Sequence, residues 1–355
     1  MRENVVDALK KCAAALQDGN PRLANTEMGR VLDLAEEETE HGTRKLIRDF
    51  AEALAWRAYG LHPKYSSFPS PACKYWMCRS HVLFSTVGRY ISKVVKGKCK
   101  VHVIELVKHM DGYKQWAELF SKFGDWGDVT HLRLSFLVQE EVEFSKESEE
   151  ELIRASKGRH IELEYKIIPV NSFADIDVSL LEMRDGEFVV VNCMFVFSKM
   201  LSEALALEKL LQRVRDIMRV DVMIVVEHDA NHNQSDFLLR LDESLRYYSS
   251  LFREEYYFEE SEPYYRYQIW NMVACEGSNR VERHQTWAQW KSLLIHYGFS
   301  IFNSFIKWEY HEYEEWMEDG ILSILSHETD KWPLFFVSAW KILTSPSKSS
   351  GSNEG

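Results

Sequence analysis

The sequence predicts a Rossmann-like α/β fold with a mostly parallel sheet, helices on both of its faces and an N-terminal helical cap. Two observations predict it. Apolar residues recur at helical spacing through residues 1–60, whereas short β-branched runs alternate with helical segments from residue 100 onward. Strands joined through a helix pair in parallel, so repeated strand–helix units build a sheet that helices cover on both faces.

Residues 1–95 are expected to form the helical cap. Gly19-Asn20-Pro21 and His41-Gly42 separate three amphipathic segments, because Gly and Pro interrupt helices. A fourth helical stretch, Tyr75–Val95, follows a loop rich in Pro and Ser. The apolar faces of the first segments must be buried against the core or against another chain. We therefore expect a dimer interface within residues 5–60.

Residues 96–343 are expected to form the α/β core. Its first strands are short apolar runs bounded by polar or turn residues. These strands are predicted at Val101–Leu106, Val129–Val138, Ile161–Pro169, Phe188–Asn192 and Asp221–Glu227. Helices are predicted between and after them, at Glu140–Ser156, Lys199–Met218, Phe237–Phe252 and Val281–His296.

Three further strands are predicted near the C-terminus, at Ile301–Trp308, Ile321–Ser326 and Pro333–Lys341. A short turn at Thr329-Asp330 joins the last two, which can therefore pair antiparallel. An antiparallel pair also closes the sheet of class I methyltransferase-like folds. Residues 344–355 are rich in Ser and Gly and are expected to be a disordered tail.

The acidic composition disfavours nucleic acid as a direct ligand. The chain has 355 residues, a formal net charge of −12 and basic runs that are all short. Such a chain is repelled by phosphate backbones unless distant Lys and Arg residues gather into a groove. The sequence shows no signal peptide and no apolar run that would span a membrane, so we expect no membrane partner.

The cysteines and histidines do not predict a metal site. The six cysteines are scattered, as expected of reduced thiols in an intracellular protein. Cys73, Cys78 and His81 lack a fourth ligand and the spacing of zinc sites. His228 and His232 are four residues apart, but they lie in a predicted loop and lack a third ligand.

Glu105, Asp111 and Glu227 lie at or after the ends of predicted strands and are candidates for general acid–base chemistry. Nothing in the sequence places them within reach of one another, and acids at strand ends more often cap helices or pair with Arg. Asn231 and Asn233 are expected to hold loop backbone groups or to cap the next helix. We therefore expect no catalytic residue.

Two features of the C-terminal third have both a structural and a binding interpretation. The charges of Glu276, Arg280, Glu282 and Arg283 alternate in sign, which indicates either a local ion-pair network or a partner surface. Trp340 ends a predicted strand. Tryptophans anchor cores and interfaces alike, and its place in a strand favours the core.

Several stretches, taken in order, resemble the GRAS family of plant regulatory proteins, including its scarecrow-like and DELLA-related members. They span nearly the whole chain and lie where the family has its VHIID, VEQEANHN, RVERHE and SAW patterns. The matching residues are Val101, His102, Val103, Ile104 and Glu105 with Gln115 and Trp116; Glu227, Asn231, His232 and Asn233; Glu276, Arg280, Val281, Glu282 and Arg283; and Ser338, Ala339 and Trp340.

The resemblance implies a nuclear transcriptional regulator that acts as a scaffold, with no catalytic residue, metal or cofactor. Its implied partners are other GRAS proteins, as homo- or heterodimers, and zinc-finger transcription factors of the indeterminate-domain type. Direct DNA contact is a weaker implication. The implied fold is a helical cap on a methyltransferase-like core. The chain begins at the family's domain, so we expect a truncated or divergent member without an N-terminal extension.

The alternative is a methyltransferase-like enzyme that binds S-adenosylmethionine. An enzyme of that fold usually has a Gly-rich turn after its first strand, so that the backbone can approach the cofactor closely. Here that turn, Leu106–Gly112, contains one glycine together with the bulky side chains of Leu106, Val107 and Met110. The turn therefore favours the scaffold over the enzyme.

Overall fold

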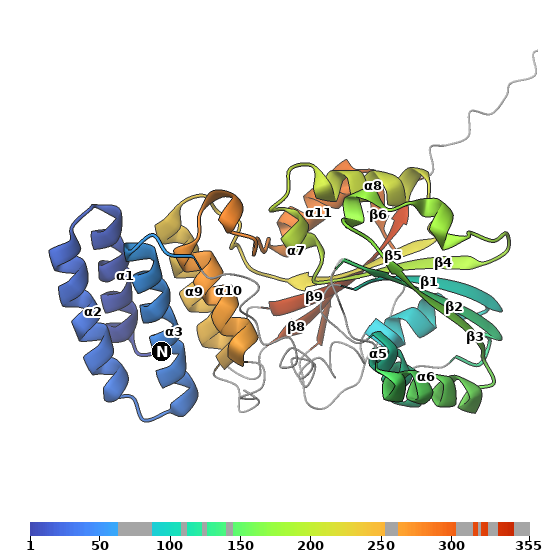
Figure 1. Cartoon of the computed structure of the whole chain (residues 1–355), viewed down its shortest axis with the longest axis horizontal. Coiled ribbons are helices and arrows are strands. Elements are labelled where there is room, and N and C mark those ends of the chain that lie inside the picture. Colours follow the sequence, from blue (N-terminus) through green and yellow to red (C-terminus); the bar gives the residue numbers. More distant parts are fainter. Residues whose placement is uncertain are drawn as a thin grey trace, which may run out of the picture.

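The structure is a computed structural model in which a sheet-centred core lies beside a layer of helices (Figure 1). It describes residues 1–62, 87–107, 112–122, 126–139, 145–252, 262–302, 315–318, 321–325 and 333–343. No helix in these ranges is both long and apolar enough to cross a membrane.

The helical layer combines the start of the chain with two later helices (Figure 1). Its members are α1 (Glu3–Gln17), α2 (Pro21–Glu36), α3 (His41–Ala58), α9 (Phe237–Phe252) and α10 (Glu262–Ala274). Asn20 caps α2 by accepting a hydrogen bond from the Leu23 N–H (3.2 Å), and Pro21 fits the first helical position. α10 packs against α3, and α9 contacts α1 and α3. The predicted cap is therefore covered by helices from the second half of the chain.

Within the described residues, parallel strands form one half of a nine-stranded sheet. Their bounds are Lys100–Val107 (β1), His131–Val138 (β2), Glu162–Pro169 (β3), Phe188–Met194 (β4) and Val222–His228 (β5). Their spatial order is β3-β2-β1-β4-β5, and every neighbouring pair is parallel. The chain thus places β2 and β3 on one side of β1, and then β4 and β5 on the other side.

Antiparallel strands form the other half. β9 (Pro333–Ile342) pairs with β5, β8 (Ile321–Leu325) pairs with β9, and β7 (Glu315–Glu318) pairs with β8. The short β6 (Phe299–Ile301) also pairs with β9. The predicted antiparallel pairing of the last two strands is therefore confirmed.

Helices cover both faces of the sheet (Figure 1). One face carries α5 (Gly112–Lys122) and α6 (Lys146–Gly158), and the other carries α7 (Phe197–Met200), α8 (Ala206–Asp216) and α11 (Trp287–His296). Successive residues of β1 point to opposite faces, so Val103 joins a core with Trp116 of α5, whereas Ile104 joins a second core with Trp290 of α11. The predicted fold class is confirmed.

Two predicted helices have different bounds in the structure. The predicted helix at Lys199–Met218 is two helices, α7 and α8, because the chain turns at Leu205, where φ is +61°. The predicted helix at Val281–His296 begins six residues later, at Trp287. Residues 87–94 are helical, and single 3₁₀ turns lie at Phe173–Asp175, Val178–Leu181 and Gly277–Asn279. The predictions for residues 75–86, 140–144, 303–308, 329–330 and 344–355 lie outside the described residues.

Candidate functional site

Glu105 lies where the order of the parallel strands reverses, with β2 on one side of its strand and β4 on the other. In open α/β sheets, ligands bind beyond the carboxyl ends of the strands at such a point. Glu105 is buried, and its carboxyl group accepts hydrogen bonds from Asn192 Nδ2 (2.7 Å) and Trp116 Nε1 (3.3 Å). This group therefore links β1 to β4 and to α5.

Burial raises the pKa of Glu105 to about 8, although the hydrogen bonds from Asn192 and Trp116 oppose the shift. The group is therefore largely protonated at neutral pH. Gln115 is also buried, and within the described residues neither atom of its amide has a hydrogen-bond partner. The remaining apolar residues of this motif are buried in the two cores: Val101, Val103 and Ile104.

The ring of His102 is buried and makes contacts through both nitrogens. Nε2 lies 2.8 Å from Ser135 Oγ, and Nδ1 accepts a hydrogen bond from Arg133 Nη2 (2.9 Å). The same guanidinium pairs with Glu187. Burial, and then the charge of Arg133, lower the pKa of His102 to about 3. The ring is therefore neutral at physiological pH and joins β1 to β2.

A second buried polar group, the histidine cluster, consists of His228, His232 and His284. All three side chains are buried. The rings of His228 and His284 stack with centroids 4.0 Å apart, and His232 Nδ1 lies 3.0 Å from His284 Nδ1. His228 ends β5, His232 lies in the loop that follows, and His284 lies in the segment before α11. The cluster therefore ties that segment to the sheet.

The hydrogen bonds of His228 indicate that it is neutral. Its Nδ1 donates to the hydroxyl of Tyr247 (2.7 Å), and that hydroxyl donates to the carbonyl of Leu334 (2.9 Å). Its Nε2 accepts from Gln268 Nε2 (3.5 Å), and the amide oxygen of Gln268 accepts from the hydroxyl of Tyr248 (2.9 Å). Each donor in this series of hydrogen bonds faces an acceptor. A proton on His228 Nε2 would instead face the amide nitrogen of Gln268, which is also a donor.

His232 and His284 form a similar neutral pair. His284 Nε2 donates to the carboxylate of Glu282 (3.3 Å), so its Nδ1 accepts the proton on His232 Nδ1. Burial lowers the pKa of all three histidines of the cluster. On the other side of Glu282, Lys199 Nζ lies 3.6 Å from the carboxylate, and both side chains are buried.

Histidine, cysteine and acidic side chains of the described residues form no group that could hold a metal ion. The contacts that His228 and His232 make are hydrogen bonds and ring contacts. Cys73, Cys78 and His81 lie outside the described residues, as does Asp111.

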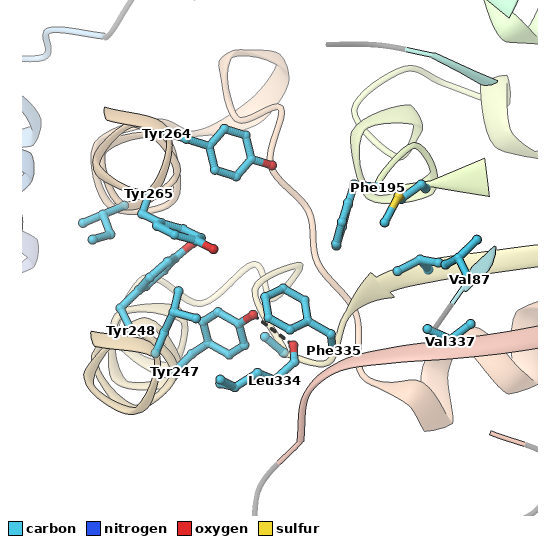
Figure 2. Close-up of a cluster of buried hydrophobic side chains, with 14 of the residues drawn as sticks. Val87, Phe195, Tyr247, Tyr248, Tyr264, Tyr265, Leu334, Phe335 and Val337 are labelled. Carbon is cyan, nitrogen blue, oxygen red and sulfur yellow. Dashed lines mark hydrogen bonds between the residues drawn. The ribbon is translucent and has the colours of Figure 1, made fainter. Parts of the chain in front are cut away.

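Aromatic side chains of the helical layer pack on the histidine cluster, because the ring centroids of Tyr247 and Tyr248 lie 5.3 and 5.8 Å from that of His232. Figure 2 shows Tyr247 and Tyr248 of α9 beside Tyr265 of α10, with the Tyr247 hydroxyl directed at the Leu334 carbonyl of β9. From β9, the ring of Phe335 packs against His228 with centroids 5.0 Å apart. The contact between layer and sheet is therefore aromatic around a polar centre.

Glu227 lies on β5, two strands from Glu105 in the sheet. Its carboxylate accepts a hydrogen bond from the Ser198 N–H in α7 (3.1 Å), and burial raises its pKa to about 7. The two acids have different hydrogen-bond partners. Each one joins its strand to neighbouring elements.

Asn231 and Asn233 do not have the predicted roles. The side-chain oxygen of Asn231 accepts from Gln289 Nε2 (3.2 Å), and that of Asn233 accepts from Arg283 Nη1 (3.1 Å). The side chain that accepts from the first turn of α9 belongs to Asp236. The two asparagines instead bind a side chain of α11, Gln289, and one of the segment that leads into it, Arg283.

The charged residues before α11 do not begin a helix, contrary to the prediction. Arg280 Nη1 donates to the carbonyl of His232 and Arg283 Nη2 donates to that of Gly277, both at 2.7 Å. Burial alternates along the segment, with Arg280, Glu282 and His284 buried and Val281, Arg283 and Gln285 partly exposed. Such alternation is typical of an extended strand-like segment.

The C-terminal motif lies within β9, with Ser338, Ala339 and Trp340 all buried. Trp340 Nε1 donates to Ser338 Oγ (2.9 Å), and Trp287 of α11 packs on the Trp340 ring with centroids 5.7 Å apart. The prediction that Trp340 belongs to the core is confirmed.

Residues 5–305 match the model of the GRAS domain family. The chain belongs to the GRAS family. It is 35% identical to the DELLA protein GAI1 of Vitis vinifera over 84% of this chain and 53% of that protein. It is 33% identical to the DELLA protein RGA of Arabidopsis thaliana over 96% of this chain and 62% of that protein. The chain thus spans between half and two thirds of the length of these curated relatives.

A solved structure shows the same fold. The crystal structure of SCL7 in Oryza sativa superposes with a TM-score of 0.74 at 19% sequence identity, over 95% of this chain and 99% of that one. The helical layer and the mixed sheet are therefore features that this GRAS protein shares with SCL7.

The GRAS motifs identified residues that the fold brings together, but they did not identify the partners of those residues. His232 meets His284, 52 residues away, and Glu105 meets Asn192, 87 residues away. Asn192 had one visible signal, a polar residue within an apolar run. Lys199 had none, because a lysine in a predicted amphipathic helix is expected to face solvent.

Proposed function

We propose that this GRAS protein is a nuclear transcriptional co-regulator that acts by protein–protein contact and not by catalysis. The observation that carries the proposal is that the buried carboxyl group of Glu105, near the end of β1, is already hydrogen-bonded within the protein. The carboxyl group there is engaged by Asn192 and Trp116, both of which are buried. The protein's own side chains thus engage this carboxyl group close to the place where an α/β enzyme would hold its ligand, which supports a role without catalysis.

The alternative, an S-adenosylmethionine-dependent methyltransferase, receives less support. The end of β1 presents Leu106 and Val107, which are both buried. A cofactor at this edge would need close approach to the backbone, which small residues permit and these side chains obstruct.

Other GRAS proteins and zinc-finger factors of the indeterminate-domain type are the partners that we propose. The outer helix α2 exposes Leu23 (44%) and Leu32 (47%), which supports pairing with a second GRAS chain through the helical layer. The net charge of −12 favours recruitment to DNA through a DNA-binding partner over direct contact.

Two measurements on the purified chain test the proposal. Calorimetric titration with S-adenosylmethionine should give no binding heat. In a mobility-shift assay, the chain should retard DNA when a zinc-finger factor is present and leave bare DNA unshifted. Micromolar cofactor binding would instead make the Glu105 region an active site. A shift of bare DNA that disappears steeply with salt would indicate direct DNA binding.

A further inference from the structure

Two arginines pair with one carboxylate where the end of α3 meets the end of α10, and two more arginines lie nearby. Glu276 pairs with Arg240 Nη2 (2.6 Å) and with Arg57 Nη1 (2.9 Å). Arg280 and Arg283 lie close by, since Arg283 donates to the carbonyl of Gly277, the residue after Glu276 (2.7 Å), and to the carbonyl of Arg280 (3.0 Å). We call Arg57, Arg240, Arg280, Arg283 and Glu276 the arginine cluster. It carries an excess of positive charge in a chain whose net charge is −12.

Backbone groups hold most of these guanidiniums in fixed positions. Arg240 donates to the carbonyls of Met272 (2.8 Å) and Gln234 (2.8 Å), and Arg57 donates to that of Val273 (3.1 Å). Among the described residues, Arg280 and Arg283 form no ion pair with a carboxylate. Carbonyl dipoles solvate a guanidinium without cancelling its charge, so the cluster keeps its positive excess. An outside anion would meet it at Arg57 and Arg283, which are partly exposed, because Arg240 and Arg280 are buried.

The cluster reaches the surface through some of its members. The side chain of Glu276 is 47% exposed and that of Arg57 is 21% exposed, whereas Arg240 is fully buried. Arg57 lies in the last turn of α3, and the residues just after that helix expose large apolar side chains, Tyr59 at 81% and Leu61 at 54%. Positive charge and apolar surface therefore lie next to each other.

We propose that the arginine cluster, with Tyr59 and Leu61, is the docking site for an acidic segment of a partner protein in which carboxylates alternate with large apolar residues. This inference rests on the scaffold function proposed above and names the chemistry of one partner. Fixed guanidinium forks suit carboxylates, which they bind through paired hydrogen bonds. Exposed Tyr and Leu suit the apolar residues of such a segment.

A protein segment fits this site better than DNA does. The cluster is compact, and the surrounding chain is strongly acidic, so a long polyanion would meet repulsion on either side of it. A short acidic segment needs only local charge complementarity, which also speeds its association and makes binding sensitive to salt.

The test is fluorescence anisotropy with a short labelled peptide in which Asp and Glu alternate with Leu and Phe, added to the whole chain. We expect the double variant Arg57→Gln/Arg283→Gln to weaken binding by about tenfold or more, because each arginine gives charge-assisted hydrogen bonds. Arg48→Gln is the matched control, since this arginine lies on the same helix and pairs with Glu36 on the surface. It should bind as the wild type does.

Glu276→Gln gives a test with the opposite sign. The substitution keeps the shape of the side chain and removes the internal anion, so we expect the peptide to bind several-fold more tightly. This variant removes no arginine, so it remains informative if the double variant unfolds in a thermal melt. Equal binding by the wild type, Glu276→Gln and the double variant would overturn the proposal. So would a DNA duplex that displaces the peptide at a lower concentration than unlabelled peptide does.

The two proposals fail in different ways. If the wild type binds the zinc-finger factor but not the acidic peptide, the docking site is wrong and the scaffold function stands. If it binds the peptide through the arginine cluster but no GRAS or zinc-finger protein, the docking site stands and the proposed partners are wrong.

Discussion

At the scale of single residues, Glu105 combines burial with neutral hydrogen-bond donors. Asn192 and Trp116 both donate to it, which favours the ionised form, yet burial outweighs them and raises the pKa to about 8. The side-chain oxygen of Asn192 has no hydrogen-bond partner among the described residues. If the Asn192 amide flips by 180°, this oxygen can accept a hydrogen bond from a neutral side chain at position 105. A neutral side chain of the same shape would therefore suit this position.

We predict that Glu105→Gln stabilises the protein at alkaline pH. The pKa of Glu105 is raised on folding, so its contribution to stability is present below the unfolded value of 4.5 and is lost as the pH rises to about 8. The variant should exceed the wild type by about 1–3 kcal/mol at pH 8 and by little at pH 5. Urea unfolding at both pH values measures the difference. A gain that is equal at the two values would contradict the explanation.

Individual residues also show what sequence could and could not predict. The order of the motifs identified Glu105, Trp116 and His232, and Trp116 does contact Glu105, but Asn192 and His284, which contact Glu105 and His232, lie far away in the chain. His284 was part of a recognised stretch and still received no role, because its ring contacts depend on where β5 and α11 meet. Pairings of this kind follow from tertiary packing, which a single sequence does not encode locally.

At the scale of elements, strands were predicted better than helix ends. Short apolar runs located β1, β4 and β5 because both faces of these strands are buried. The segment before α11 was wrongly predicted to be helical. Its buried and exposed residues alternate, but the buried ones include the charged Arg280 and Glu282, so the pattern of hydrophobic residues does not show the alternation. α11 itself begins at a capping box, in which Thr286 accepts from Gln289 N and Gln289 accepts from Thr286 N.

The capping box gives a prediction for α11. Thr286→Ala removes the hydroxyl that accepts from the first turn, and should lower the free energy of unfolding by about 1 kcal/mol. Thr286→Ser keeps the hydroxyl and is the matched control, which we expect to stay close to the wild type. Chemical denaturation compares the two variants. A loss of equal size in both would show that the methyl group, not the cap, contributes the stability.

Two helical glycines should respond in opposite ways to alanine. A Cβ atom at Gly88 would lie 2.2 Å from Cδ2 of Leu119, a buried side chain of α5. Gly88→Ala should therefore destabilise the protein by about 1–3 kcal/mol. Gly29 lies in α2 and a Cβ atom there would meet nothing within 4 Å, so Gly29→Ala should stabilise by roughly 0.5–1 kcal/mol. Thermal unfolding of both variants tests the packing of residues 87–94 against α5.

At the scale of the whole molecule, buried titratable groups lie at the contact between sheet and helical layer. His228, His232 and His284 are neutral there, and His102 is neutral between β1 and β2, because burial lowers the pKa of each. Burial has the opposite effect on the pKa of the two buried acids, Glu105 and Glu227, which it raises. Histidines and acids thus make stability depend on pH in opposite directions.

The sum of these effects predicts a stability maximum near pH 6.5. The unfolded pKa is 4.5 for Glu and 6.5 for His. Between these pH values, the unfolded chain binds protons on all four of these histidines, whereas the folded chain holds protons only on its two buried acids. Stability should therefore fall toward acid by roughly 2–3 kcal/mol per pH unit. Above pH 6.5 the unfolded histidines have lost their protons while folded Glu105 and Glu227 still hold theirs, so stability should also fall as the pH rises to about 8.

Urea unfolding from pH 5 to pH 9 measures the free energy of unfolding on the acid and alkaline limbs of this curve. Two variants test which residues cause each limb. His228→Gln removes one buried histidine and should reduce the acid slope by about one proton, roughly 1.4 kcal/mol per pH unit. Glu105→Gln should flatten the alkaline limb and leave the acid slope steeper, because the folded state then keeps one proton fewer. A single limb that rises steadily from pH 5 to pH 9 would mean that the buried acids are ionised in the folded protein. In that case the link between β1, β4 and α5 would be a charged one, and the strand ends around Glu105 would regain the electrostatics of a ligand site.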